Sequence, residues 1–186
     1  YIAELLARRH RVEVLTTCAH DYVTWRGTYP EGTESINGVS VRRFAVAQWW
    51  SLVARWRPTW LNLVPTIVAY LLNAPDPTPA EREAMRGVRF ARSASAPLPP
   101  EQQRAFEERF GIPIIEAMGL TECASVAFCN PMRSRERRIG SPGLPLAIEA
   151  RVVDREGRTL SVGERGDIQL RGPGVMLGYY RAPELT

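Results

Sequence analysis

Short apolar runs alternate with helical patterns along the middle of the chain, and this alternation constrains the fold most strongly. Val88–Ser93 and Pro113–Glu116 have the length and composition of strands, while Pro100–Phe110 between them is an amphipathic, charged stretch that ends at Gly111. Strands that alternate with helices build a parallel sheet covered by helices. We therefore predict an α/β fold followed by a small β unit.

Two further regions of the chain have different secondary-structure patterns. Before residue 48, strand patterns are interrupted by turn signals such as Asn37-Gly38. Beyond Gly140 the pattern becomes β throughout, with a turn at Asp154–Gly157. The remaining predicted elements are a helix end at Ile2–Arg9, strands at Arg11–Thr17, Val39–Val46, Thr59–Val64, Ile148–Val153 and Gly166–Arg171, and helices at Pro65–Leu72 and Ala80–Met85.

A shift in composition near residue 48 predicts a domain boundary. Only one of the 15 prolines lies in the first 50 residues, and four tryptophans crowd the boundary: Trp49, Trp50, Trp56 and Trp60. Core packing is the favoured interpretation of these rings, and exposure at a junction is the alternative. The predicted domains are 1–48, 49–140 and 141–186.

Composition excludes several classes of protein. The apolar fraction of 45% indicates a folded chain. The longest apolar stretch, Trp60–Leu72, holds 13 residues and is too short to span a bilayer. The 3 cysteines lack metal-site spacing, so we expect a reducing, cytoplasmic setting. Because the chain begins without methionine inside a helical pattern, we also expect an incomplete N-terminus.

All 24 basic residues are arginine, and the chain contains no lysine. A Walker-type phosphate loop and Schiff-base chemistry are therefore excluded, since both need lysine. A net charge of +4 is weak evidence for nucleic acid, and we expect no nucleic-acid partner. The dense cluster Arg133–Arg138 is interpreted as a solvated loop, with a phosphate-binding rim as the alternative.

The segment Glu116–Glu122 combines a glycine, a hydroxyl and a carboxylate within four positions. Gly119 lets the backbone approach a ligand closely, the Thr121 hydroxyl can bond a phosphate oxygen, and the Glu122 carboxylate is a hard ligand for Mg²⁺. The competing interpretation is that Thr121 and Glu122 only cap a helix. By itself the segment does not decide between the two.

Three segments, in order, resemble the adenylate-forming superfamily, which includes acyl-CoA synthetases and aryl-CoA ligases. The resemblance covers residues from about 56 to 186, and it implies an incomplete three-layer α/β piece of the family's N-terminal domain, followed by a small β unit. Its segments are Arg92–Leu98, Met118-Gly119-Leu120-Thr121-Glu122, and Gly163–Tyr180. The order of the three segments makes the resemblance specific.

The resemblance implies an ATP-dependent acid–thiol ligase. A carboxylate attacks the α-phosphate of Mg·ATP, and a thiol (coenzyme A or carrier-bound phosphopantetheine) then displaces AMP. The resemblance assigns Thr121 to a phosphate and Glu122 to Mg²⁺, whereas Gly163–Tyr180 is interpreted as structural. The adenine and acyl-pocket walls are assigned to Ser95, Ala96, Pro97, Glu116, Ala117, Met118, Gly119 and Leu120.

The sequence departs from the family pattern in ways that predict a partial enzyme. Met118 stands where the family often has an aromatic ring, and a thioether packs on adenine more weakly. The phosphate loop with its lysine, the ribose-binding aspartate and the C-terminal lysine domain are missing. We therefore expect little or no turnover, and we expect incomplete sheet edges to promote self-association.

The first 48 residues resemble the N-terminal part of a GT-B glycosyltransferase instead. Leu6–Thr17, Tyr29–Gly32 and Asn37–Phe44 carry this second resemblance. It implies a sugar-transferase fragment as an alternative function. A truncated or rearranged product without enzymatic activity is the third possibility.

Overall fold

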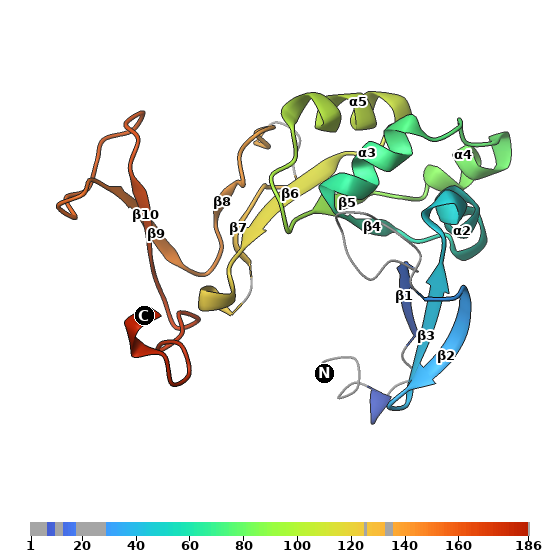
Figure 1. The fold of residues 1–186 in the computed structure, drawn as a ribbon. Helices are drawn as coiled ribbons and strands as arrows, with labels where there is room; N and C mark the ends of the chain where they lie inside the picture. Colours follow the sequence, from blue (N-terminus) through green and yellow to red (C-terminus); the bar gives the residue numbers. More distant parts are fainter. Residues whose placement is uncertain (1–6, 10–12, 18–28, 125, 133–135, 186) are drawn as a thin grey trace. The chain divides into compact units, whose positions relative to one another are not determined.

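The computed structural model describes residues 7–9, 13–17, 29–124, 126–132 and 136–185, which form two compact units. The first unit comprises residues 1–59 and 66–88, and the second comprises residues 60–65 and 89–186. Figure 1 follows the chain through both. The predicted helix at Ile2–Arg9 falls mainly outside the described residues.

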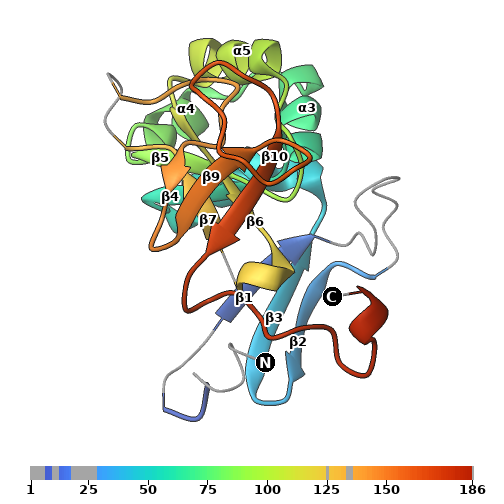
Figure 2. The ribbon, with the colours of Figure 1, turned by 90° about the vertical axis from the view of Figure 1, so that its left-hand side faces the viewer.

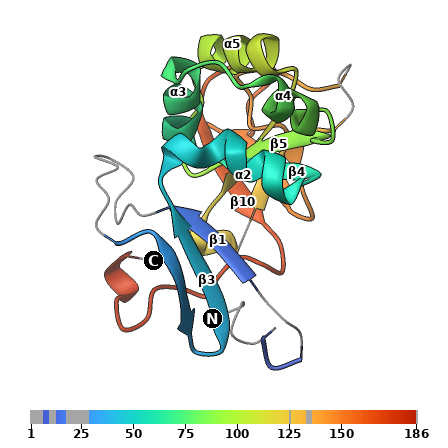
Figure 3. The ribbon, with the colours of Figure 1, turned by 90° about the vertical axis from the view of Figure 1, so that its right-hand side faces the viewer.

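The first unit contains a three-stranded sheet in the order β1-β3-β2. Strand β1 (Glu13–Thr17) runs parallel to β3 (Val39–Phe44), and β2 (Gly32–Ile36) pairs antiparallel with β3 (Figure 3). Asn37 and Gly38 join β2 to β3 with φ angles of 50° and 81°. Such a two-residue turn matches the twist of a hairpin, so the predicted turn and the predicted strand after it are confirmed. Strand β2, which precedes the turn, was not predicted.

Among its described residues the first unit also contains the helices α2 (Trp49–Trp56) and α4 (Pro79–Met85) and all of α3 (Pro65–Asn73) except Pro65. A short 3₁₀ turn, η1 (Val46–Gln48), precedes α2. Helix α2 was not predicted from the sequence. The two interpretations of the tryptophans, core packing and exposure, each hold for some of the rings. Trp50 is buried in α2, whereas Trp56 is 41% exposed, with the guanidinium of Arg42 5.0 Å from its ring centre.

A capping box starts helix α4. The Thr78 hydroxyl accepts a hydrogen bond from the Glu81 N–H at 3.3 Å, and the Thr78 N–H donates to the Glu81 carboxylate at 2.7 Å. Two backbone donors at the helix start are thereby satisfied.

We expect Thr78→Ala to destabilise the first unit by about 1 kcal/mol, because the Glu81 N–H loses its acceptor. Urea unfolding followed by tryptophan fluorescence measures the effect, since Trp50 is buried in the same unit. Thr78→Ser keeps the hydroxyl and should retain most of the stability. Equal losses in the two variants would contradict the capping role.

The second unit is built on a mixed five-stranded sheet in the order β4-β5-β6-β7-β8. Strands β4 (Trp60–Leu63), β5 (Phe90–Ser93) and β6 (Ile114–Gly119) are parallel. Strands β7 (Val126–Cys129) and β8 (Leu144–Pro145) continue the sheet with antiparallel pairing. The predicted α/β fold is confirmed. The apolar composition of Thr59–Val64 also predicts a buried strand. Strand β4 lies at the edge of the sheet, however, and its Trp60 is 48% exposed, so the prediction of burial was wrong.

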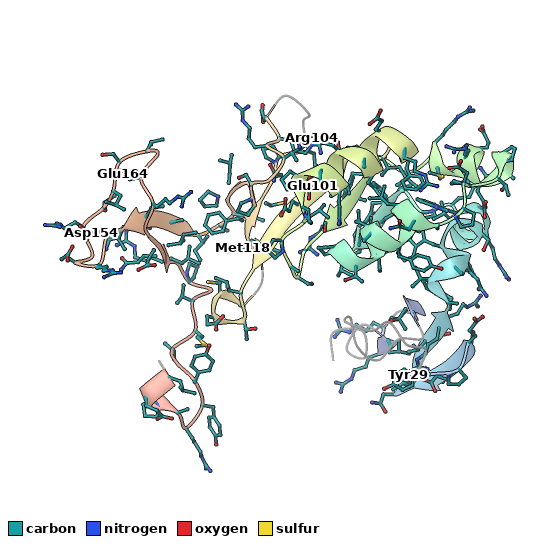
Figure 4. All side chains as sticks on the ribbon, turned by 45° about the horizontal axis from the view of Figure 1, so that its top comes forward. Tyr29, Glu101, Arg104, Met118, Asp154 and Glu164 are labelled. Atoms are coloured by element: carbon teal, nitrogen blue, oxygen red, sulfur yellow. The ribbon has the colours of Figure 1, made fainter. Side chains whose placement is uncertain are left out.

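Helix α5 (Pro100–Phe110) has the bounds that the sequence predicted and ends at Gly111, which has a φ of 69°. Figures 1 and 2 show α5 lying over one face of the sheet. Its inward side is formed by Gln103, Phe106 and Phe110, all buried. Glu101 and Arg104, labelled in Figure 4, are exposed on its other side.

Arg137 departs from the predicted solvated loop. Its guanidinium pairs with both carboxylate oxygens of Glu107 on α5 and donates to the Ile114 carbonyl at 2.8 Å. The two side chains are only 10% and 19% exposed. Glu107 also accepts from the Ile114 N–H at 3.0 Å. Arg137 therefore joins its loop to α5 and β6, while Arg133 and Arg135 lie outside the described residues.

A second, two-stranded sheet follows in the same unit. Strands β9 (Glu149–Val153) and β10 (Asp167–Arg171) pair antiparallel, as the sequence predicted. Asp154 and Glu164 lie in the turns between them (Figure 4). The short 3₁₀ helices η2 (Thr121–Cys123) and η3 (Pro183–Leu185) complete the described elements. No helix among the described residues has the length and apolar character needed to cross a membrane.

Candidate functional site

The parallel register of β5 and β6 brings two predicted ligand segments to one edge of the sheet. Ser93, the last residue of β5, pairs with Glu116 in β6. The carboxyl end of β5 therefore lies beside the middle of β6, where the parallel pairing ends, and the exposed residues Ser95, Ala96 and Pro97 follow β5 after Ala94. Ser95 has a φ of 80°, so the chain turns sharply at this point. In open α/β sheets this edge is where ligands bind.

Glu116 links the loop after β5 to β6. Its Oε1 accepts a long hydrogen bond of 3.5 Å from the Leu98 N–H, and its backbone carbonyl accepts from the Asn130 N–H at 3.0 Å. Its Oε2 and the hydroxyl of Ser93 are buried without a hydrogen-bond partner among the described residues. Burial raises the pKa of Glu116, against a smaller opposite effect of the Leu98 N–H. Two unsatisfied polar atoms thus lie where the parallel pairing of β5 and β6 ends.

Strand β6 runs further than the sequence indicated, because it pairs with β7 as well as with β5. Residues Glu116 to Gly119 all belong to it, and the register with β7 shifts between Met118 and Gly119. Ala117 is buried, Met118 is half-buried, and Gly119 and Leu120 are exposed. Figure 4 shows Met118 on the strand. The first four motif residues are therefore held in a sheet and not in a loop.

Thr121 and Glu122 lie on the single 3₁₀ turn η2 that follows β6. The residue preceding this turn is Leu120, and no side-chain capping bond is present there. Helix capping therefore does not explain the two side chains. The Thr121 side chain is exposed and available to a ligand.

Glu122 is held by a segment far along the chain. The phenol of Tyr179 donates a hydrogen bond to the Glu122 carboxylate, and the Met176 N–H donates to the Glu122 carbonyl at 2.8 Å. The Tyr179 bond lowers the pKa of Glu122, with a smaller contribution from the Glu122 backbone, and keeps its carboxylate ionised. Sequence inspection missed Tyr179, because 57 positions separate it from Glu122 and no spacing links the two.

The residues around η2 fit a metal that arrives with a nucleotide. No group of three or more His, Cys, Asp or Glu side chains suited to a metal occurs among the described residues. Mg²⁺ bound with a nucleotide needs only one or two protein carboxylates, because phosphates and water complete its coordination. The ionised carboxylate of Glu122 meets that requirement.

Comparison with known proteins decides the family. The sequence profile of the family described as "AMP-binding enzyme" matches residues 9–180. The chain belongs to the AMP-binding enzyme family. Because the match begins at residue 9, it includes most of the first 48 residues, and the expected resemblance of that part to a glycosyltransferase is not supported.

Two curated relatives of this AMP-binding chain show what it is similar to. It is 54% identical over 144 residues to the sulfoacetate–CoA ligase of Cupriavidus necator, covering 77% of this chain and 27% of that protein. It is 41% identical over 136 residues to the anthranilate–CoA ligase of Pseudomonas aeruginosa, covering 72% and 24%. The chain thus spans about a quarter of the length of these relatives.

Solved structures of the family share the fold. ATP-bound MatB from Rhodopseudomonas palustris superposes with a TM-score of 0.68 at 27% identity, covering 97% of this chain and 36% of that one. A benzoate CoA ligase from Burkholderia xenovorans gives a TM-score of 0.67 at 25% identity, covering 98% and 38%. Both match nearly the whole of this chain.

Proposed function

We propose that this chain forms the central part of the nucleotide site of an ATP-dependent acid–CoA ligase. The reaction joins a carboxylate to the α-phosphate of ATP with release of pyrophosphate, and coenzyme A then takes the acyl group from the adenylate. Family membership and two relatives named as CoA ligases support this activity. The chain spans about a quarter of the length of these relatives, so the whole reaction is part of the proposal.

The observation that carries the proposal is the Ser93–Glu116 register. It brings the start of the loop with Ser95–Pro97 to Glu116, where the parallel pairing ends and β6 continues to Gly119, and in this proposal an adenine ring lies between these two stretches of backbone. The unsatisfied Glu116 Oε2 and Ser93 hydroxyl offer hydrogen bonds at that edge. An unsatisfied buried polar atom is unfavourable, and a ligand or water that bonds it recovers this energy.

Thr121 and Glu122 supply the polar chemistry in this proposal. The Thr121 hydroxyl donates a hydrogen bond to a phosphate oxygen and helps to orient the phosphate chain. The carboxylate of Glu122 would hold Mg²⁺, which when bound neutralises negative charge on the phosphates. Both side chains act by positioning charge and not by covalent catalysis.

The acid is a small carboxylate in this proposal. The 54% identity to a protein named for sulfoacetate makes a short, doubly anionic acid the first candidate, and anthranilate is the second because of the 41% relative. The arginine-only complement of cations is compatible with an anionic substrate, because guanidinium groups pair with carboxylates and sulfonates alike.

We expect Thr121→Ala to weaken Mg·ATP binding to the 186-residue chain by about tenfold, because a hydrogen bond to a charged phosphate contributes about 1.5 kcal/mol. Titration calorimetry measures the dissociation constant. Thr121→Ser retains the hydroxyl and should bind nearly as well as the unaltered chain. Equal affinity for the alanine variant would remove Thr121 from the site.

Turnover is tested separately by pyrophosphate release with Mg·ATP and either sulfoacetate or anthranilate. Release that depends on one acid identifies the substrate class. Nucleotide binding without release is the result expected of a partial site. Failure to bind ATP, ADP and AMP would contradict the proposed function.

A further inference from the structure

The segment from Gly174 to Tyr179 contacts both the backbone and the side chain of Glu122. Its Met176 N–H bonds the Glu122 backbone carbonyl, and its Tyr179 phenol bonds the Glu122 carboxylate. Gly174 packs so closely on η2 that a Cβ added to it would lie 3.1 Å from the Cys123 carbonyl oxygen. The backbone and the side chain of Glu122 are thus fixed by one short stretch of chain.

We propose that Tyr179 is a positioning residue that orients the Glu122 carboxylate for the metal of the bound nucleotide. This inference rests on the proposed function. It also changes the interpretation of Gly163–Tyr180, which the sequence indicated to be structural only. Two donors from one segment hold Glu122, so the direction of the carboxylate is set before any ligand arrives.

The physical reason lies in the freedom of a glutamate side chain. Glutamate has three rotatable side-chain bonds, and ordering such a side chain on binding is entropically unfavourable. The Tyr179 phenol hydrogen-bonds Oε1 and so already orders part of the Glu122 side chain in the folded chain. Less side-chain entropy is therefore lost when the metal binds. Hydrogen-bonding partners of metal ligands act in this way elsewhere, and their loss weakens metal binding by about 10- to 100-fold.

The test compares Tyr179→Phe with Tyr180→Phe in the 186-residue chain. Tyr180 is the adjacent tyrosine, 86% exposed, with its ring beside Arg181, so its variant controls for loss of a phenol. ATP affinity is measured by calorimetry with Mg²⁺ and with EDTA. We expect Tyr179→Phe to reduce the gain in affinity caused by Mg²⁺ by about tenfold and to leave metal-free affinity unchanged.

A second measurement needs no nucleotide. Amide hydrogen exchange at Met176 reports the bond from its N–H to Glu122. We expect exchange to become several-fold faster in Tyr179→Phe and to stay unchanged in Tyr180→Phe. Glu122→Gln separates the hydrogen bond with Tyr179 from the binding of Mg²⁺. The amide oxygen of the glutamine still accepts from the phenol, so the Met176 N–H should stay protected. The gain in ATP affinity from Mg²⁺ should be lost, because the carboxylate is absent.

The outcomes distinguish this inference from the proposed function. Unchanged exchange and an unchanged effect of Mg²⁺ in Tyr179→Phe would overturn the positioning role. A second outcome is that exchange changes as expected but the unaltered chain gains no ATP affinity from Mg²⁺. In that case Tyr179 still orients Glu122, whereas the proposed function and the role of Glu122 in binding the metal both fail. Faster exchange together with a reduced effect of Mg²⁺ supports both.

Discussion

Arg137→Ala is expected to destabilise the second unit by about 3 kcal/mol, because it leaves the Glu107 carboxylate, on a side chain only 19% exposed, without its countercharge. In the native chain Arg137 bonds both oxygens of Glu107 and the Ile114 carbonyl. Ile114 is fully buried at the start of β6, so the loss reaches the strand that carries the candidate site. Urea unfolding followed by far-UV circular dichroism measures the change in free energy.

Arg138→Ala is the matched control, because Arg138 is the exposed neighbour and its hydrogen bonds among the described residues are made by backbone atoms. Its N–H donates to the Asn130 side chain, and its carbonyl accepts from the Ser141 N–H at 3.2 Å. Its effect should stay within about 0.5 kcal/mol. Adding Glu107→Gln to Arg137→Ala should recover part of the loss, since the buried charge is removed. An Arg137→Ala effect no larger than the control would show that the pair contributes nothing.

The Glu107 carboxylate also predicts a pH dependence. Burial acts to raise its pKa, but hydrogen bonds from Arg137, Ile114 and Gln103, together with the Arg137 charge, outweigh it, and the pKa is lowered. The unfolded chain therefore takes up this proton at a higher pH than the folded chain. The stabilisation is complete above the unfolded-state pKa and is lost as pH falls through the lowered value. Arg137→Ala should lack most of this acid sensitivity.

Gly143→Ala is expected to destabilise the second unit by about 4 kcal/mol, the sum of backbone strain and overpacking. Gly143 has a φ of 95°, and a Cβ there would lie 2.2 Å from backbone atoms of Cys129 and Asn130. Those atoms belong to the β7–β8 pairing and to the Asn130 N–H bond with the Glu116 carbonyl. The same unfolding experiment detects the loss.

Gly163→Ala separates the two contributions. Gly163 has a nearly identical φ of 97°, but nothing lies within 4 Å of its added Cβ. Its alanine variant should therefore show the strain alone, about 1 to 2 kcal/mol. If the two variants were equally destabilised, close packing at Gly143 would play no part.

Local patterns predicted the elements whose signals lie within one segment. Helix α5 was predicted at its observed bounds because its apolar positions repeat on one face and Gly111 supplies the left-handed end. The β2–β3 turn was found because Asn-Gly favours positive φ at both positions. Strands β7 and β8 were missed, since each is short and gains its order from pairing with a neighbour.

The candidate site shows the same division. The motif Glu116–Glu122 was evident from residue types, and its family follows from three ordered segments. That β6 continues through Gly119 was not evident, because the cause is its pairing with β7. The low exposure of the Arg137 side chain was not evident either, since a charged run is expected to be solvated until its partner on α5 is known.

Sequence alone determined the alternation of strands and helices, the absence of lysine and the residue types that can meet a nucleotide and its metal. These properties are local, because they depend on side-chain chemistry and on periods of a few residues. Only the tertiary structure decided which of these residues meet. The Ser93–Glu116 register and the Tyr179–Glu122 bond join residues 23 and 57 positions apart, and such contacts arise from strand pairing and chain packing, which no local pattern encodes.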